Sequence, residues 1–446
     1  MKKIFLIFSI LFLSFLPLYA GNITRLSLKQ CENSALSKYY KVKEAQYHAQ
    51  AAQQNLKSNN KSLYPTLSLN ATTGYSAVLP SLSIMGNNET FGDYWNYCIG
   101  PTISYILFDN GAKNANYRST QNLYESKLQD LEWEKKNVIV SVRLKYFQIQ
   151  AILEKIYILG ERLNLAENQY KDITINYKSG TKSKLDLLMA HKQVLLAQNQ
   201  IELARSKLSK FLRELFILTQ DNFSIDLSYP IDYRLTKQQY IKTASCILKA
   251  DNVAESIKEF SVYENYIFDN LNPQLLSLER IMQYYINVAN SYKSQKWPFV
   301  KLQGSGYYQY PNGPVKEEIL QGTADLILSM PIFEFGNKEA LSKANKLTSK
   351  AVEEQKTGLI KALKRDFNNA KDQIYVIDIQ ECINNKIVQD NQKIVELTYT
   401  SYQLGQATFL EVQTANFELS QSKIDLIDLK IEKLANLAVI AGLGKQ

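Results

Sequence analysis

The stretch Ile106-Leu107-Phe108-Asp109-Asn110-Gly111 closes a segment of alternating apolar residues and opens a long segment without proline. A similar stretch, Pro331-Ile332-Phe333-Glu334-Phe335-Gly336, lies 225 positions further along the chain. The alternation before each stretch has the period of a β-strand. Proline is absent from 102–229 and from 332–446, where helix-forming residues are frequent. Each stretch therefore predicts a junction between a strand and a long helix.

A second pair of motifs has the same separation. The segments Tyr177–Leu187 and Tyr402–Val412 share a tyrosine, a glycine, a hydroxyl residue, a leucine, an acid and an aliphatic residue in order. Gly405 follows Gly180 by the same 225 positions. Two motifs with one separation indicate an internal two-fold repeat. The span between strands is shorter in the second copy, and we expect a loop to absorb that difference.

The repeat predicts the order of the elements. Alternation predicts a pair of strands in each copy, at 66–75 and 95–107 and at 300–310 and 320–330. A continuous helix from Gly111 to Tyr177 would span about 100 Å, and Gly180 supplies a left-handed residue that ends it. A second helix then runs back toward Leu218, and Gly405 ends the equivalent helix in the second copy. Further helices are expected ahead of the strands, at 32–62 and 273–295.

These elements divide the chain into four parts. Residues 1–20 carry two lysines, a short apolar run and a small residue at the end, which is the pattern of a secretory signal peptide. Residues 21–220 form the first repeat, 221–272 a connector and 273–446 the second repeat. No later stretch has the ~18 apolar residues of a membrane-spanning helix. An exported chain of this kind is secreted, periplasmic, or a closed β-barrel in the outer membrane.

Composition argues against several classes of function. The formal net charge of +9 comes from basic residues interspersed with acids along 446 residues, which is typical of solvated helices rather than of a nucleic-acid site. The four cysteines have no metal-binding spacing and leave a disulfide unassigned; they are Cys31, Cys98, Cys246 and Cys382. Two isolated histidines form no catalytic arrangement. We therefore expect no enzyme, no cofactor and no metal.

The duplicated junctions and turns resemble those of the outer-membrane efflux protein (TolC) family. Asn272-Pro273-Gln274-Leu275, followed by a helix that runs into Trp297-Pro298, also looks like the opening of that family's second half. The resemblance covers nearly the whole chain after the signal peptide. It implies a mainly α-helical fold with a transmembrane β-barrel. In a homotrimer, each subunit would give four strands to a shared twelve-stranded barrel, above a tapering α-helical tube in the periplasm.

The resemblance also implies a function. Family members are exit ducts of tripartite efflux pumps or type I secretion systems in the outer membrane of Gram-negative-type cells. They work with a periplasmic membrane-fusion adaptor and an inner-membrane transporter driven by protons or ATP. Within the membrane, outer-membrane lipid would surround the barrel. The alternative from another class is a periplasmic coiled-coil adaptor or scaffold that never enters a membrane.

The turns hold the candidate gate. In the family, acids soon after the turn glycine line the narrowest point, and the matching residues are Asp186 and Glu411. A threefold ring of carboxylates would attract cations, whereas the alternative is a solvated acid in the first turn of a helix. Tyr402 matches a gate tyrosine. The family's second acid and its arginine are replaced here by Thr414 and Ala407, while the first copy has Lys182.

Apolar residues beside the turn glycines are candidate adaptor contacts, since exposed apolar side chains at a tip suggest a docking site. They are Leu185, Leu187, Leu410 and Val412. Packing within the hairpin is the alternative for each of them.

Overall fold

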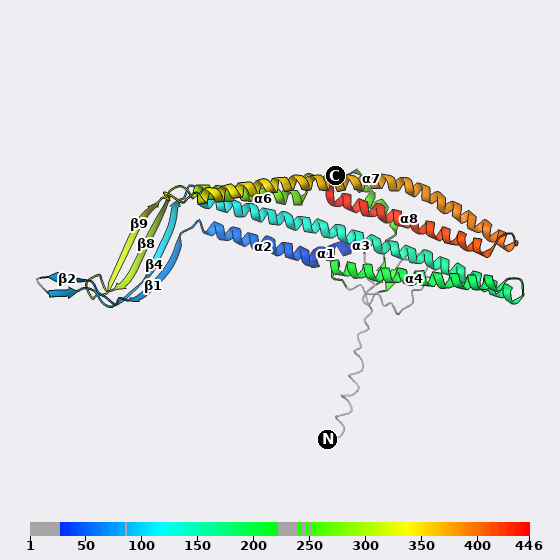
Figure 1. The fold of residues 1–446 in the computed structure, drawn as a ribbon, viewed down its shortest axis with the longest axis horizontal. Helices are drawn as coiled ribbons and strands as arrows, with labels where there is room; N and C mark the ends of the chain where they lie inside the picture. The colour runs from blue at the N-terminus through cyan, green and yellow to red at the C-terminus, as the bar shows by residue number, and fades with distance from the viewer. Residues whose placement is uncertain (1–26, 85–86, 222–239, 243–246, 250) are drawn as a thin grey trace, which may run out of the picture. The chain divides into compact units, whose positions relative to one another are not determined.

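A computed structural model describes residues 27–84, 87–221, 240–242, 247–249 and 251–446 of the chain (Figure 1). The expected signal peptide, Cys246 and part of the expected connector lie outside the described residues. The chain divides into two compact units. Two long helices, α3 (Ala112–Lys178) and α7 (Asn337–Gln403), begin in the second unit and end in the first.

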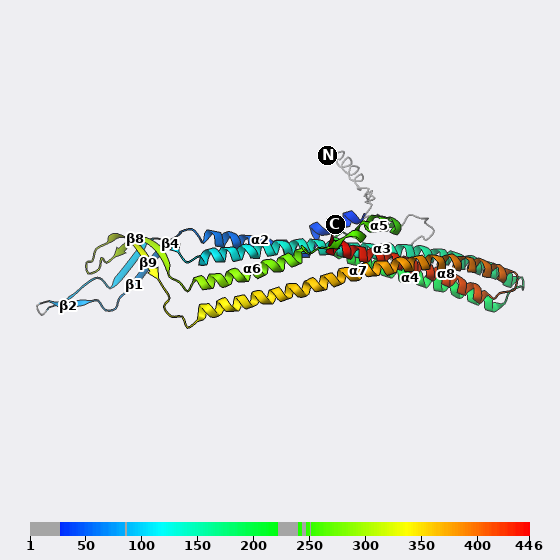
Figure 2. The same ribbon diagram turned by 90° about the horizontal axis from the view of Figure 1, so that it is seen from above.

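The first unit comprises Met1–Lys43, Lys135–Asp269 and Lys364–Gln446, as far as these are described. Besides the ends of α3 and α7 it contains α1 (Leu28–Lys38), α4 (Lys184–Thr219), β5 (Tyr240–Lys242), β6 (Ile247–Lys249), α5 (Val253–Phe260), the 3₁₀ helix η1 (Ser261–Asn265), β7 (Ile267–Phe268), α8 (Phe409–Leu443) and β10 (Gly444–Lys445). In both views α4 runs beside α3 and α8 runs beside α7 (Figures 1 and 2). The core between them is apolar; Phe147, Leu208 and Leu212 are fully buried.

The second unit comprises Glu44–Glu134 and Asn270–Leu363. It contains most of α2 (Tyr40–Lys61), β1 (Thr66–Tyr75), β2 (Ser81–Ile84), β3 (Asn87–Thr90), β4 (Trp95–Phe108), α6 (Pro273–Ser294), β8 (Phe299–Tyr310) and β9 (Ile319–Ser329). The strands differ from the predicted bounds by one residue at most. Asn272 caps α6 through a 2.9 Å bond from the N–H of Gln274 to its side chain, and Pro273 begins the helix without a spare donor.

Four strands form one antiparallel sheet in the order β1-β4-β8-β9 (Figure 1). Its register places Thr66 opposite Ser104, Ser104 opposite Gln303, and Gln303 opposite Asp325. The next row on this face carries four hydroxyls, from Ser68, Thr102, Ser305 and Thr323. Successive side chains alternate between the two faces of a strand, so one face of the sheet is polar throughout most of its length.

The other face of the sheet is apolar and exposed. Leu67 is 75% exposed, Leu320 80% and Leu328 72%. Among the described residues β1 and β9 each pair with one strand only, so both edges of the sheet carry free backbone groups. A large exposed apolar face beside two open edges indicates a surface that something else covers.

The two loops that connect the strand pairs differ in length, as the sequence predicted. Residues 76–94 contain a small hairpin in which β2 pairs with β3. Residues 311–318 contain only an isolated bridge between Asn312 and Val315. The extra hairpin was not predicted, because its four-residue strands are too short to show a periodic pattern.

One predicted helix is divided. The segment expected as a single helix at 32–62 forms α1 and α2, with Tyr39 in an extended conformation between them. The Ser37 hydroxyl donates back to the carbonyls of Asn33 and Ser34, both at 3.0 Å. Such bonds offer backbone carbonyls a partner outside the helical ladder. Among the helices in the described ranges, none combines the length and hydropathy needed to cross a membrane.

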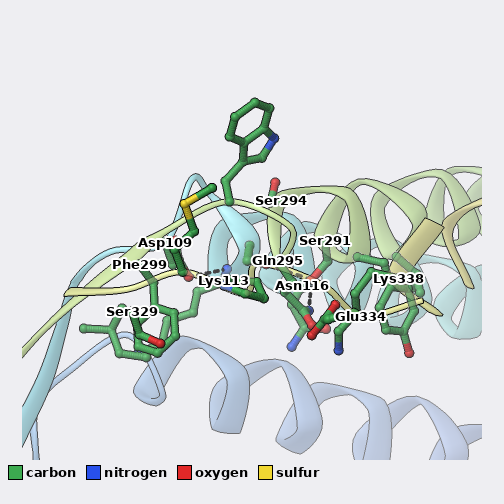
Figure 3. Close-up of a pocket in the computed structure, with 17 residues that line it drawn as sticks. Asp109, Lys113, Asn116, Ser291, Ser294, Gln295, Phe299, Ser329, Glu334 and Lys338 are labelled. Atoms are coloured by element: carbon green, nitrogen blue, oxygen red, sulfur yellow. Dashed lines mark hydrogen bonds between the residues drawn. The ribbon is translucent and has the colours of Figure 1, made fainter. Parts of the chain in front are cut away.

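A cavity of about 660 Å³ lies in the second unit, where the strands give way to helices (Figure 3). Side chains from β4, β8, β9, α3, α6 and the start of α7 line it.

Candidate functional site

Both helical hairpins turn at a glycine in the left-handed conformation. Gly180 has φ +78° and Gly405 has φ +77°, which other residues adopt only with strain. The residue after each glycine donates its N–H to a carbonyl five positions earlier, at 2.9 Å in the first turn and 2.8 Å in the second. These bonds satisfy carbonyls at the ends of α3 and α7. The backbones of the two turns are therefore alike.

The candidate gate acids cap the helices that follow the turns. The Asp186 carboxylate accepts from the N–H and the hydroxyl of Ser183, at 3.3 and 2.9 Å. The Glu411 carboxylate accepts from the N–H of Thr408 at 2.7 Å. The Ser183 and Thr408 hydroxyls in turn accept from the N–H groups of these acids, which completes a capping box at each helix. In this single chain, each acid occupies the first turn of a helix.

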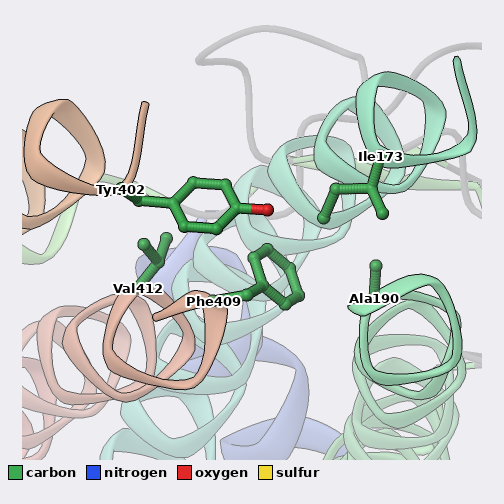
Figure 4. Packing of buried hydrophobic residues seen from close by; sticks show 5 residues of the cluster. All are labelled: Ile173, Ala190, Tyr402, Phe409 and Val412. Carbon is green, nitrogen blue, oxygen red and sulfur yellow. The ribbon is translucent and has the colours of Figure 1, made fainter. Parts of the chain in front are cut away.

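Tyr402 lies inside the hairpins rather than on their surface. It is 8% exposed, and its ring centroid is 5.6 Å from that of Phe409. Four helices supply the buried cluster around it (Figure 4); the cluster is Ile173, Ala190, Tyr402, Phe409 and Val412. The ring extends from the end of α7 toward Ile173 of α3. Tyr402 thereby joins the two hairpins of one chain.

Lys182 contacts Tyr402 from the other turn. Its Nζ lies 3.8 Å from the centroid of the Tyr402 ring, within cation–π range. Burial raises the pKa of Tyr402, and the Lys182 ammonium opposes that shift. The Tyr402 hydroxyl has no hydrogen-bond partner in the described part of the chain. Both side chains line a small cavity of about 290 Å³.

Sequence reasoning missed other contacts between the hairpins. The Gln193 amide donates to Gln413 at 3.1 Å, and the Arg162 guanidinium lies 5.1 Å from the centroid of the Phe417 ring. Burial lowers the pKa of Arg162. These partners lie more than 200 positions apart in the sequence, and no local pattern links them. They show that the hairpins are joined along their length and not only at the turns.

The four candidate adaptor contacts separate into two groups. Leu185 and Leu410 are 61% and 56% exposed. Leu187 packs against the buried cluster, and Val412 is 1% exposed within it. The place of Val412 in this chain therefore matches the alternative, packing within the hairpin. Helical periodicity puts it on the core side of α8, three residues after Phe409.

The described residues show no arrangement that suggests a metal centre. No group of three or more His, Cys, Asp or Glu side chains within them is placed to hold a metal ion. Of the cysteines in that part of the chain, Cys31 is buried, Cys98 is half-buried and Cys382 is exposed, and none forms a disulfide.

Comparison with known proteins finds the same architecture. The family model described as outer membrane efflux protein matches residues 33–219. No curated protein matches the chain in sequence. Among solved structures, CusC has a TM-score of 0.74 at 15% identity, covering 95% of this chain and 93% of its own. The CmeC outer membrane channel of Campylobacter jejuni has a TM-score of 0.69 at 18% identity, and the match covers 94% of this chain and 86% of CmeC. The outer membrane protein VceC of Vibrio cholerae has a TM-score of 0.73 at 13% identity, and the match covers 93% of this chain and 95% of VceC.

At these identities the solved structures establish the fold, and the family match carries the relationship. The matched family is one of efflux proteins, which agrees with the prediction that the chain is not an enzyme. The match over residues 33–219 and the shared fold together confirm the resemblance to the outer membrane efflux protein (TolC) family.

Proposed function

We propose that three copies of the chain form a duct through the outer membrane. Each copy would give its four strands to one twelve-stranded β-barrel, with outer-membrane lipid around it. The observation that carries this proposal is the sheet itself, with one polar face, one exposed apolar face and two open edges. A lone four-stranded sheet leaves those edges unsatisfied in lipid, whereas a closed barrel pairs every strand.

Two copies of one unit would build each subunit. The proposed parts are a signal peptide at 1–20, repeats at 21–220 and 273–446, and a connector at 221–272. In support, α3 and α7 each contain 67 residues, and each follows a glycine with positive φ, Gly111 and Gly336. Each is followed by a shorter helix after a second such glycine.

The duct would be passive and serve a tripartite efflux pump or a type I secretion system. A periplasmic membrane-fusion adaptor would join it to a proton- or ATP-driven inner-membrane transporter, which supplies the energy. The long helices would form its large periplasmic part. The exposed leucines beside the turns, Leu185 and Leu410, are the proposed adaptor contacts.

The turns would close the duct at its periplasmic end. Asp186 and Glu411 would each form a ring of three carboxylates while they cap α4 and α8. The Lys182–Tyr402 contact would hold the two hairpins of each copy together in the closed state. The Lys182–Tyr402 contact would take the place of the family's arginine pairing, which the second turn cannot make because it has Ala407 instead of the arginine.

Cysteine cross-linking tests the closed end. In a variant without the native cysteines, Glu411→Cys and a short trifunctional maleimide, which can join one thiol from each of three subunits, should give covalent trimers in whole cells. Lys207→Cys on α4, an exposed position away from the turns, is the matched control and should give none. Failure to trap trimers through residue 411 in any state of the pump would refute the closed ring.

Membrane fractionation separates the duct from the alternative of a periplasmic adaptor or scaffold. A duct should sediment with outer membranes and resist extraction by alkaline carbonate. A periplasmic protein should appear in the osmotic-shock fraction, and that result would remove the barrel from the proposal.

A further inference from the structure

The 660 Å³ cavity of the second unit opens on the polar face of the sheet. Three strand residues line it, Ile106, Phe299 and Ser329. Phe299 lies opposite Ser329, and Ile106 lies opposite Lys301. Because side chains alternate along a strand, these positions share the face that carries Gln303 and Asp325 further along the strands. In the proposed duct that face lines the interior.

One side of the cavity is apolar and rich in aromatic rings. The side chains that form it come from β4, from α6, and from the start of β8 and the end of β9 with the residues beside them; they are Ile106, Val288, Tyr292, Trp297, Phe299 and Met330. Figure 3 shows Phe299 and Ser329 at the strand end and Ser291 and Gln295 at the end of α6. A concave site with apolar walls and a few polar groups is the usual form of a small-molecule site.

The other side carries four charged residues, and two of them are already engaged. The Asp109 carboxylate accepts from the N–H groups of Gly111 and Lys113, at 3.1 and 2.8 Å. The Lys113 ammonium donates to the carbonyl of Ser62 at 2.7 Å. These two groups stabilise the start of α3, and both already have partners within the protein.

The remaining two charges are available to a ligand. Glu334 has no side-chain partner among the described residues. Lys338 makes no ion pair in that part of the chain, and its Nζ lies 5.9 Å from the centroid of the Tyr292 ring. One unpaired carboxylate and one unpaired ammonium therefore stand on the polar side of a cavity whose other side is apolar.

We propose that this cavity binds a zwitterionic amphiphile, a small molecule with an apolar body, a cationic group and an anionic group. The apolar body lies against Trp297, Phe299 and Met330. Glu334 receives the cationic group and Lys338 the anionic group. Because the cavity faces the interior of the proposed duct, it is a resting site for transported molecules of this class; that role rests on the proposed function, whereas the binding does not.

Quenching of Trp297 fluorescence tests the site. The full chain is purified into amphipol, with Trp95 and Trp133 changed to Phe so that Trp297 is the reporter. The probe is an alkyl sulfobetaine brominated at the end of its chain. We expect saturable quenching that the unbrominated sulfobetaine reverses, and weaker binding of trimethylammonium and sulfonate analogues of the same chain length.

The charge variants give the sharper test. Glu334→Gln with Lys338→Met should raise the apparent Kd of the sulfobetaine about tenfold, equivalent to about 1.4 kcal/mol. Lys343→Gln, a charge change on α7 outside the cavity, is the matched control and should leave the Kd unchanged. Sulfobetaine binding equal to that of either singly charged analogue would overturn the proposal, as would non-saturable quenching or equal binding by the double variant. Planar-bilayer conductance measured on the same preparation reports separately whether the duct exists.

Discussion

The turn that ends α3 and the turn that ends α7 have the same backbone and different side chains. Each has a left-handed glycine, each closes with the same type of hydrogen bond, and each leads into a capping box. Yet Lys182 stands two residues after one glycine, and Ala407 stands two residues after the other. The first turn supplies a cation, and the second supplies the aromatic ring that receives it.

The difference shows how a duplicated element acquires a new contact. The glycine and the cap determine the path of the chain, so the side chains beside them are free to differ. An alanine in both turns would leave the Tyr402 ring without the ammonium that contacts it. The unequal pair joins the hairpins within one chain.

The largest expected effect comes from removing the shared ring. Tyr402→Ala should lower the free energy of opening at the turns by about 3 kcal/mol, because it leaves a cavity in the buried cluster. Hydrogen–deuterium exchange of the amides in both turns measures that change. Tyr375→Ala, at a residue of α7 that is 71% exposed, is the matched control and should alter exchange little. Equal effects of the two variants would show that the cluster does not hold the hairpins together.

Exchanging a turn glycine tests whether the two backbones are equivalent. Nothing lies within 4 Å of a Cβ built on Gly180 or Gly405, so the cost of a side chain is conformational. Gly180→Ala and Gly405→Ala should each destabilise their own turn by about 1–2 kcal/mol. Differential scanning calorimetry and local amide exchange give the two values. A clearly larger loss in one turn would contradict the equivalence.

Replacing Lys182 tests the side-chain difference between the two turns. Lys182→Met keeps the length of the side chain and removes the charge, so it should weaken the interaction between the two hairpins by about 0.5–1 kcal/mol. Single-channel recordings should then show more frequent opening. Lys178→Met, at an exposed position on the last turn of α3, is the matched control. Adding Ala407→Lys to the Lys182→Met variant tests whether a cation from the second turn restores that interaction; we expect that it does not, because Lys182 reaches the ring from the opposite hairpin.

Replacing Glu411 distinguishes its role as a helix cap from the effect of its charge on ion selectivity. Glutamine also serves in a capping box, so Glu411→Gln should change stability by no more than a few tenths of a kcal/mol. In planar bilayers the same change should reduce the preference for cations over anions. Unchanged selectivity would show that Glu411 acts only as a cap.

The smallest expected effect is seen at high pH. The neutral phenol of Tyr402 is favoured in the folded state because burial raises its pKa above the ordinary value near 10. Its contribution is therefore complete below pH ~10 and is lost as the pH rises through the raised value. Wild type should lose stability at the turns relative to Tyr402→Phe above pH ~10. Parallel losses in the two proteins would argue against this titration.

Much of the fold was predictable, for local reasons. Period-two alternation located the four strands within a residue, because the alternation follows directly from the pleat. The glycines at 111, 180, 336 and 405 all have positive φ. As the sequence predicted, Gly111 and Gly336 precede the long helices, and Gly180 and Gly405 follow them. The division of the first predicted helix at Tyr39 was missed, because no proline or glycine within 32–62 marks it.

The candidate site was predictable only in part. The sequence singled out Asp186, Glu411, Lys182 and Tyr402 because they occupy the positions beside the turns that match the gate of the TolC family. Their partners were not predictable, because a carboxylate's role depends on whether a cap or a neighbouring copy meets it. For Val412 the sequence left a surface contact and packing within the hairpin both open, and its position in the buried cluster with Phe409 agrees with the packing.

By itself, the sequence determined the alternation of short strands and very long helices, the positions of the turns and the duplication of the motifs. Those properties depend on residues a few positions apart, or on the repetition of such groups. Only the tertiary structure decided that Lys182 meets the ring of Tyr402 and that Glu334 and Lys338 stand unpaired beside an aromatic cavity. Contacts between residues distant in the chain arise when helices pack, and no local pattern records which side chains then face each other.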